Sequence, residues 1–172
     1  MVFSSFVFLC AFLPLVFILH QVIRPVRWKN AVLFAFSLLF YAWGEPVYIL
    51  LMLTSILINY VLGLGMEHGS PARNKLLMLL ALVFNLGSIL FFKYGDFILT
   101  NLGLVLHAQM PVIGLALPIG ISFYTFQILS YVLDVYKGRV KVQHSFLSLG
   151  TYIALFPQLV AGPIVRYETV EA

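Results

Sequence analysis

Long apolar runs separated by short polar stretches recur along the whole chain. Six such segments can be drawn, at approximately residues 2–20, 30–43, 46–66, 75–92, 112–136 and 145–165. A run of about 20 apolar residues is long enough to cross the hydrocarbon core of a bilayer as an α-helix. The pattern therefore predicts an all-α polytopic membrane protein with five to six transmembrane or re-entrant helices.

Two of these segments are poor candidates for complete spans. Segment 30–43 would be only about 21 Å long as a helix, so it either spans with little tilt or forms a re-entrant pair with the next segment. In segment 145–165, Pro157 and the Gly162–Pro163 pair interrupt helical hydrogen bonding. Broken backbone at membrane depth needs protein or a water-filled cavity around it. A re-entrant segment is therefore expected there at least as readily as a complete span.

Composition agrees with a membrane location. Hydrophobic residues make up 62% of the 172 residues and charged residues only 9%, against roughly 25% charged in soluble domains. The net charge of +4 requires no nucleic-acid partner, because basic loops on the cytoplasmic side of a membrane produce the same excess.

The basic residues also predict an orientation. Eight of the ten lie in the first, third and fifth connections, namely Arg24, Arg27, Lys29, Arg73, Lys75, Lys137, Arg139 and Lys141. The positive-inside rule places these connections in the cytoplasm. No basic residue precedes the first apolar run, which favours a retained first span over a cleaved signal peptide. We therefore expect a periplasmic N-terminus in a bacterial inner membrane.

The fourth connection, residues 93–111, has two open interpretations. The stretch FFKYGDF, which begins at Phe91, mixes aromatic and apolar residues with two charges at its edge. This mixture is typical of a helix that lies in the membrane interface. The alternative is a plain periplasmic loop.

The fifth apolar segment carries the candidate functional residues. Its polar side chains Tyr124, Gln127, Tyr131 and Asp134 follow Gly120 at spacings of 4, 3, 4 and 3, which places them on one helical face. They are candidates for lining a polar tunnel. Alternatively, they hydrogen-bond to neighbouring helices, the interpretation favoured for Ser122, Thr125 and Ser130. Asp134 is a functional candidate if buried, and a structural partner of Lys137 or Arg139 if it lies at the interface.

No residue set in the chain forms a complete active site. The four histidines, His20, His68, His107 and His144, lie outside the apolar spans, and none has a metal-ligand spacing to another histidine or carboxylate. Each is expected to be a loop residue. No catalytic residue, metal site or bound cofactor is predicted.

Several motifs together resemble the N-terminal part of the membrane-bound O-acyltransferases, in the branch of the bacterial alginate O-acetyltransferases. In chain order they are MVFSS at Met1, FYAWG at Phe40, FFKYGDF at Phe91, LPIGISFYTFQ at Leu117, YVLDVYKG at Tyr131 and FPQLVAGPIVRY at Phe156. The resemblance covers the whole chain, and the ordered set is more specific than any one motif. The D-alanyl transferases of teichoic acid are a more distant match.

The resemblance implies acetyl transfer from a cytoplasmic thioester, similar to acetyl-coenzyme A, to hydroxyls of an exported polysaccharide. It also implies that residues 1–172 are the N-terminal part of one transmembrane domain, whose catalytic histidine matches no position here. Such a chain would be inactive alone. The segments Pro118–Gln127 and Phe156–Arg166 match tunnel walls, so Pro157, Gln158, Gly162, Pro163 and Arg166 join the candidates. Expected partners are the bilayer, the missing C-terminal part, periplasmic acetyltransferases and an export complex.

Two other classes of function compete with this one. Polar tracks and broken helices also mark transporters and channels, although the two halves of the chain show no inverted repeat and few intramembrane charges are present for ion coupling. A non-catalytic scaffold of a polysaccharide-modification complex is the third possibility.

Overall fold

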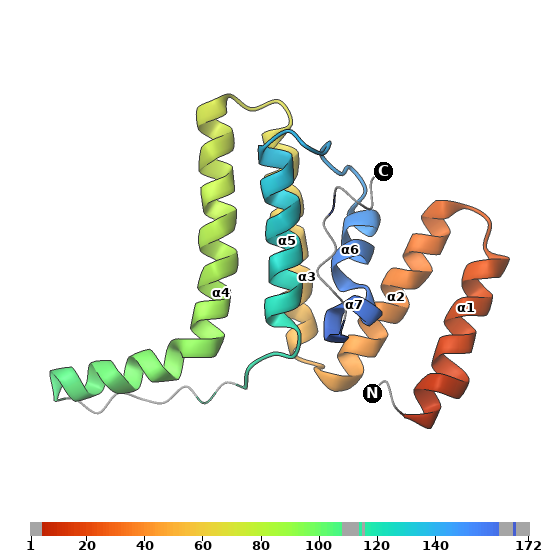
Figure 1. Ribbon diagram of the computed structural model, residues 1–172, viewed down its shortest axis with the longest axis horizontal. Coiled ribbons are helices and arrows are strands. Elements are labelled where there is room, and N and C mark those ends of the chain that lie inside the picture. The colour runs from red at the N-terminus through yellow and green to blue at the C-terminus, as the bar shows by residue number, and fades with distance from the viewer. Residues whose placement is uncertain (1–4, 108–113, 115, 162–166, 168–172) are drawn as a thin grey trace.

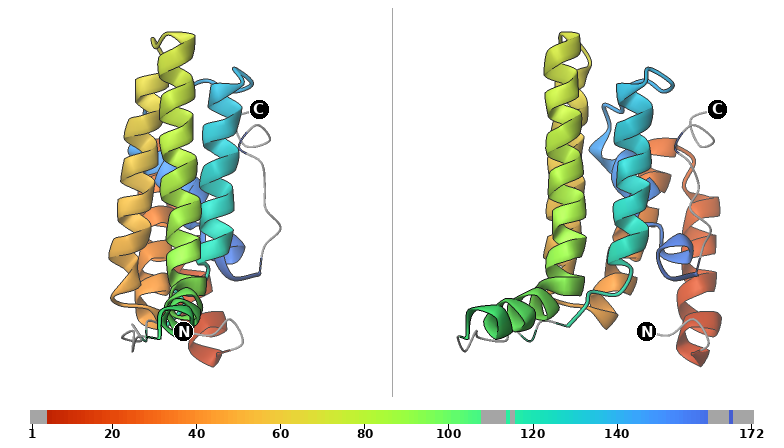
Figure 2. Two further views of the ribbon diagram at one scale, coloured as in Figure 1. Left: turned by 90° about the vertical axis from the view of Figure 1, so that its left-hand side faces the viewer. Right: turned by 60° about the vertical axis from the view of Figure 1, so that its left-hand side comes forward.

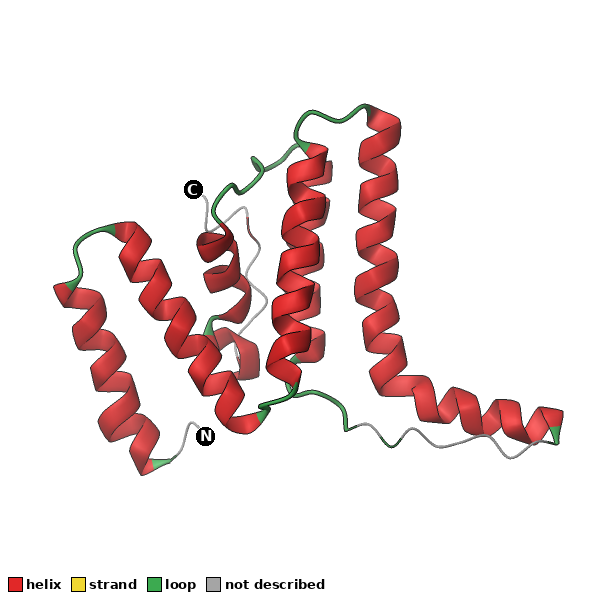
Figure 3. Cartoon of the chain, turned by 180° about the vertical axis from the view of Figure 1, so that it is seen from behind, coloured by secondary structure: helices red, strands yellow, loops and turns green. Residues whose placement is uncertain are grey.

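The computed structural model describes residues 5–107, 114, 116–161 and 167, and in these residues the chain is helical and has no strand (Figure 1, Figure 3). The elements in order are the π-helical turn η1 (Phe8–Phe12), α1 (Leu13–Val22), α2 (Val26–Gly44), α3 (Tyr48–Met66), α4 (Pro71–Leu106), α5 (Ile121–Tyr136), α6 (Phe146–Ala154) and α7 (Phe156–Ala161). The predicted all-α class is confirmed.

Local residue chemistry sets the ends of these helices. The Ser70 hydroxyl caps α4 by accepting from the Arg73 amide, with Pro71 in the first turn. Ser145 caps α6 in the same way. Before α5, Gly120 has φ of 78°, and a Cβ there would lie 3.0 Å from the Leu159 carbonyl oxygen. Only glycine tolerates both conditions.

The helices form a bundle in which segments distant in sequence pack together. α5 packs against α3 and α4, whereas α6 packs against α2 and α3, and α1 lies on the outer side of α2 (Figure 1). Figure 1 also shows the α1–α2, α3–α4 and α5–α6 connections at the same end of the bundle. We call it the basic end, after Arg24, Arg27, Lys29, Arg73, Lys75, Lys137, Arg139 and Lys141. The assignment of this end to the cytoplasm stays a prediction.

Among the described residues, two helices are long and apolar enough to cross a membrane, namely α3 and α4. The five to six spans predicted from sequence are therefore not confirmed. The segment predicted at 30–43 begins four residues earlier, so α2 has 19 residues, about 28 Å of helix. Its first turn carries Arg27 and Lys29, which makes it less apolar than α3.

The fourth and fifth predicted segments need correction. α4 does not end near residue 92 but continues to Leu106 and has 36 residues, so a plain loop after Lys93 is the wrong interpretation and the helical one is right. Figure 2 shows the second half of α4 turning away from the bundle. The fifth helix begins at Ile121 rather than near 112, because Pro118 and the left-handed Gly120 precede it.

The predicted interruption of the last segment is present but lies earlier than expected. α6 has nine residues, Leu155 leaves the helical conformation with ψ of 114°, and α7 follows. Continuing the helix would place Pro157 in its interior, where it removes a hydrogen bond and clashes with the preceding turn. Restarting at Phe156 places the proline in a first turn, where it is tolerated. Gly162 and Pro163 lie outside the described residues.

The exterior is unusually apolar, and several polar side chains are buried within the bundle. Large apolar side chains such as Leu39, Leu57 and Val83 are 60%, 51% and 64% exposed. The buried polar side chains include Ser37, Ser55, Asn59, Asn85, Thr125, Gln127, Asp134 and Thr151. An apolar exterior of this extent is suited to lipid or to further protein.

Candidate functional site

The four polar residues predicted on one face of α5 are all buried. Tyr124, Gln127, Tyr131 and Asp134 retain 6% exposure or less, and this side of α5 packs against α3, α6 and α7. The periodicity therefore identified the buried face of the helix correctly. Their role as lining of a tunnel stays a prediction.

Two of these side chains contact residues that line a groove between α2, α6 and α7. The Gln127 Nε2 atom donates to Gln158 Oε1 at 2.9 Å. The Tyr131 hydroxyl accepts from the Gln143 amide at 3.1 Å, and its ring meets that of Tyr167 edge to face at a centroid distance of 4.9 Å. The polar face of α5 thus lies one layer behind the groove wall and positions it.

The groove consists of two adjoining cavities. The outer cavity, of about 700 Å³, opens at the basic end and is lined by Val26, Arg27, Asn30, Tyr60, Gln143, His144, Ser145, Phe146, Leu147 and Ser148. The inner cavity, of about 390 Å³, is lined by Asn30, Leu33, Gln143, Ser148, Thr151, Tyr152, Leu155, Gln158 and Tyr167. Asn30, Gln143 and Ser148 border both. We call the two together the polar groove.

Hydrogen bonds fix the residues at the junction of the two cavities. Asn30 Nδ2 donates to Ser148 Oγ at 3.2 Å, which joins α2 to the first turn of α6. Gln143 Oε1 accepts from the Ser145 amide at 2.9 Å, while Gln143 Nε2 donates to the Tyr167 hydroxyl at 2.8 Å. The Thr151 hydroxyl donates to the carbonyl oxygen of Leu147 at 2.7 Å. These bonds hold the groove open with neutral polar side chains along it.

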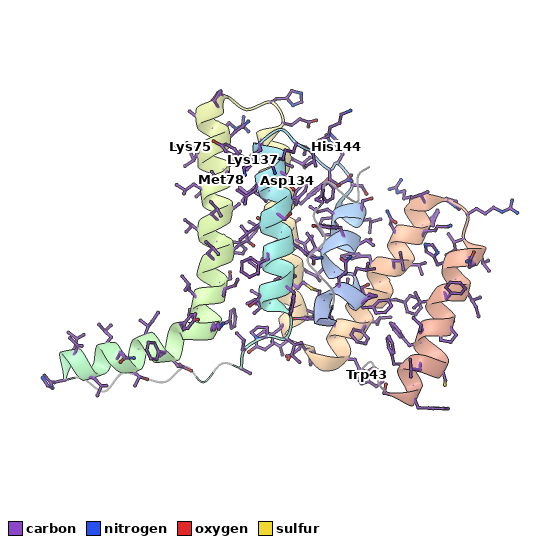
Figure 4. The ribbon with its side chains drawn as sticks, viewed as in Figure 1. Trp43, Lys75, Met78, Asp134, Lys137 and His144 are labelled. Carbon is purple, nitrogen blue, oxygen red and sulfur yellow. The ribbon has the colours of Figure 1, made fainter. Side chains whose placement is uncertain are left out.

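The outer opening combines positive charge with one histidine–carboxylate pair. His144 Nε2 lies 3.0 Å from Glu67 Oε1, and the Tyr60 hydroxyl donates to the His144 carbonyl oxygen at 2.6 Å. Figure 4 places His144, Lys75 and Lys137 at the basic end, on the α5–α6 connection, α4 and the end of α5, and of these three His144 lines the cavity. Arg27 also lines the opening. This end of the groove is suited to attract an anionic ligand.

Asp134 is both buried and paired with an arginine, although these were alternatives in the prediction from sequence. Its side chain is buried, and Arg139 Nη1 lies 3.8 Å from Asp134 Oδ1, so Arg139 is the ionic partner. Figure 4 places the residue near the basic end. Asp134 Oδ2 has no hydrogen-bond partner among the described residues, and the same is true of Tyr41 Oη, Tyr124 Oη and Gln127 Oε1.

The remaining sequence candidates are only partly brought together. Gln158 lies in the polar groove, whereas Pro157 is exposed. Gly162, Pro163 and Arg166 lie outside the described residues. Asn30, Gln143 and Thr151 were not predicted from sequence, because no local pattern of polar residues distinguishes them. All four histidines were expected to be loop residues: His68 and His144 lie in connections, whereas His20 lies in the last turn of α1, so that expectation is wrong for His20.

The described residues do not include a group of three His, Cys, Asp or Glu side chains arranged to hold a metal ion. The groove exposes hydroxyl and amide groups, which are able to form hydrogen bonds to a ligand.

Comparisons with curated proteins identify relatives over nearly the whole chain. The chain is 36% identical over 174 residues to "Probable alginate O-acetylase AlgI" of Pseudomonas aeruginosa, covering 98% of this chain and 33% of the relative. It is 35% identical to the protein of the same name in Azotobacter vinelandii, covering 97% and 34%. It is 32% identical over 197 residues to "Peptidoglycan O-acetyltransferase" of Helicobacter pylori, covering 97% and 37%.

No protein-family model and no solved structure gives a significant match. The relatives nevertheless agree with one another in the chemistry that their names describe, the O-acetylation of a polysaccharide. The chain spans about a third of the length of the curated relatives it matches. Over that stretch, it is a homologue of the alginate and peptidoglycan O-acetyltransferases.

Proposed function

We propose that this chain forms the N-terminal part of a membrane-embedded O-acetyltransferase that acts on the hydroxyls of an exported, alginate-like polysaccharide. Identity of 32–36% over at least 97% of the chain to proteins named as O-acetyltransferases is the observation that carries this proposal. The polar groove supports it, because the groove connects the basic end to the broken segment α6–α7 at the middle of the bundle.

In this proposal the acetyl donor is a thioester similar to acetyl-coenzyme A, and it enters from the basic end. Arg27 at the outer opening favours the anionic part of such a donor. The neutral side chains farther in, including Thr151 and Gln158, hydrogen-bond to its amide and carbonyl groups. A histidine supplied from beyond these 172 residues acts as the base that activates the acceptor hydroxyl.

The proposed setting is the bacterial inner membrane, with the basic end in the cytoplasm and the N-terminus in the periplasm. The 172 residues belong to one transmembrane domain of the membrane-bound O-acyltransferase type, completed by a C-terminal part. Periplasmic acetyltransferases and a polysaccharide export complex are the proposed protein partners. The apolar exterior of α3 and α4 supports the lipid contact.

A bulky substitution that blocks the groove tests the proposal. Ser148→Phe in the full-length protein places a ring at the junction of the two cavities, where Ser148 borders both. In a strain that lacks the native enzyme, this variant should restore little acetylation of the exported polysaccharide. Acetyl esters are measured on the purified polymer and the protein is quantified by immunoblot of membranes.

Thr54→Phe is the matched control, because it adds the same ring at an exposed position of α3. The control should retain wild-type acetylation. If Ser148→Phe accumulates normally and acetylates as well as Thr54→Phe, the groove is not the donor path. If the wild-type full-length protein adds no acetyl groups to any exported polysaccharide, the proposed reaction is wrong.

A further inference from the structure

The second half of α4 departs from the bundle as a separate helical arm, residues 93–106. α4 has 36 residues and is about 54 Å long as a helix, whereas roughly 20 residues cross a 30 Å hydrocarbon core. About 16 residues are therefore more than the span requires. Figures 1 and 2 show that this length does not extend along the bundle, because the helix turns and projects sideways at the end opposite the basic end.

One side of the arm carries its polar residues. Lys93, Asp96, Thr100 and Gly103 are spaced 3, 4 and 3, which places them on one helical face. The Asp96 carboxylate accepts from the Gly114 amide at 3.1 Å, and Gly103 is buried. Gly114, in the connection to α5, therefore lies beside this polar side.

The opposite side of the arm is apolar and is not covered by any described residue. Ile98, Leu102 and Val105 are spaced 4 and 3 and are 53%, 43% and 75% exposed. Phe97 and Leu104 are also exposed, but they lie on the flank of the arm nearer Lys93 and Thr100. Such a surface would be unfavourable in water.

Aromatic residues gather where the arm leaves the bundle. Tyr48 at the start of α3 packs edge to face on Phe92 at a centroid distance of 5.7 Å, and its hydroxyl donates to the Ala116 carbonyl oxygen. Trp43, at the end of α2, is 71% exposed at this same end of the bundle (Figure 4). Aromatic side chains of this kind concentrate at the boundary between the hydrocarbon core and the headgroups.

We propose that the arm lies in the lipid interface of the leaflet opposite the basic end. The partner of its apolar side is the acyl-chain boundary of that leaflet, and its polar side faces the headgroups and water. The surplus length of α4, its turn, its two-sided polarity and the adjacent aromatic residues all favour lipid as the occupant. The arm anchors the bundle at a fixed depth and is independent of the reaction that the protein performs.

Depth measurements on single cysteines test this. In a cysteine-free version of the full-length protein, with Cys10 and any cysteine beyond residue 172 replaced by serine, cysteines replace Ile98, Leu102 and Val105 on the apolar side and Thr100 on the polar side. Each is labelled with the environment-sensitive fluorophore NBD after reconstitution into nanodiscs of phosphatidylethanolamine and phosphatidylglycerol. The three apolar-side probes should emit at shorter wavelength than the Thr100 probe and be quenched by lipid-borne nitroxides.

Two results would overturn the proposal. Quenching by soluble nitroxide at all four positions would mean that the arm stands in water. Blue-shifted emission at positions 98, 102 and 105 that neither the lipid-borne nor the soluble nitroxide quenches would mean that other protein covers the apolar side. The labelled variants are compared only where membrane insertion equals that of the cysteine-free parent.

Discussion

Buried polar side chains in this chain find partners on neighbouring helices. Asn59 of α3 and Asn85 of α4 are 0% and 1% exposed. Their side-chain amides form two hydrogen bonds with each other: Asn85 Nδ2 donates to Asn59 Oδ1 at 2.8 Å, and Asn59 Nδ2 donates to Asn85 Oδ1 at 3.2 Å. Each also donates to a carbonyl oxygen four residues earlier in its own helix. From sequence, both asparagines fit the general pattern of interhelical bonding, but their mutual pairing is visible only in the fold.

Replacing one asparagine should lower the free energy of unfolding by more, per residue replaced, than replacing both. Asn59→Leu leaves the buried Asn85 amide without its partner, so we expect a loss of about 1–3 kcal/mol in unfolding free energy. The double variant with Asn85→Leu removes both polar groups and should lose less than the sum of the single variants. The measurement is SDS-induced unfolding in mixed micelles, with Thr54→Val at an exposed site as control. Strictly additive losses would contradict direct pairing.

Gln127 acts on the groove through Gln158. Its Nε2 atom holds Gln158 Oε1, so Gln127→Leu in the full-length protein should lower polysaccharide acetylation while membrane insertion and abundance stay normal. If the contact is the reason, the losses from Gln127→Leu and Gln158→Leu should be less than additive in the double variant. Acetyl esters per polymer mass are the readout. Unchanged acetylation in Gln127→Leu would remove this residue from the site.

At the scale of elements, α2 and α6 approach closely because of a glycine. A Cβ on Gly150 would lie 2.7 Å from the Phe34 ring, and Phe34 is itself buried and packs edge to face on Phe146. The contact between these helices also forms the floor of the polar groove, since Asn30 and Ser148 belong to the same pair.

Gly150→Ala should therefore destabilise the protein by about 1–3 kcal/mol through overpacking. A second change, Phe34→Leu, should restore part of the loss by giving the methyl group space. Gly87→Ala serves as the comparison, because a Cβ at Gly87 meets nothing within 4 Å and alanine is the better helix former. Thermal unfolding in detergent measures all three. Equal behaviour of the two glycine variants would show that the α2–α6 contact is loose.

The elements themselves were predicted with unequal success. Apolar runs located the helices, and proline placement located the break between α6 and α7 to within a few residues, because both depend on local chemistry. The length of α4 was underestimated, since Lys93 and Asp96 suggested an end to the apolar run although neither residue stops a helix. The start of α5 was placed too early because residues 116–120 are apolar but not helical.

At the scale of the whole molecule, the positions of the basic residues predicted the arrangement of the connections better than any motif did. The first, third and fifth connections, which carry eight basic residues, were predicted to lie on one side of the membrane. They lie at one end of the bundle. The polar groove, by contrast, could not be predicted, because Asn30, Gln143 and Thr151 come from α2, the α5–α6 connection and α6. Only the packing of these elements brings such unremarkable residues together.

The orientation of the bundle follows from the same charges. In a Cys10→Ser background, His68→Cys lies at the basic end and Gly44→Cys at the opposite end, and both positions are exposed. A membrane-impermeant maleimide should label Gly44→Cys in intact spheroplasts and His68→Cys only after permeabilisation. The reverse pattern would place the basic end, and with it the outer opening of the groove, in the periplasm.

The aromatic contacts of the N-terminus carry a consequence for biosynthesis. Phe8 and Phe12 pack on Phe156 of α7 at centroid distances of 5.9 and 5.5 Å, with Phe40 completing the cluster. A ribosome adds about 5–20 residues per second, so the first helix to emerge waits on the order of ten seconds for its final neighbour. During that interval lipid or the insertion machinery must shield the part of these rings that Phe156 later covers, and the N-terminal helix completes this packing only after α7 has been made.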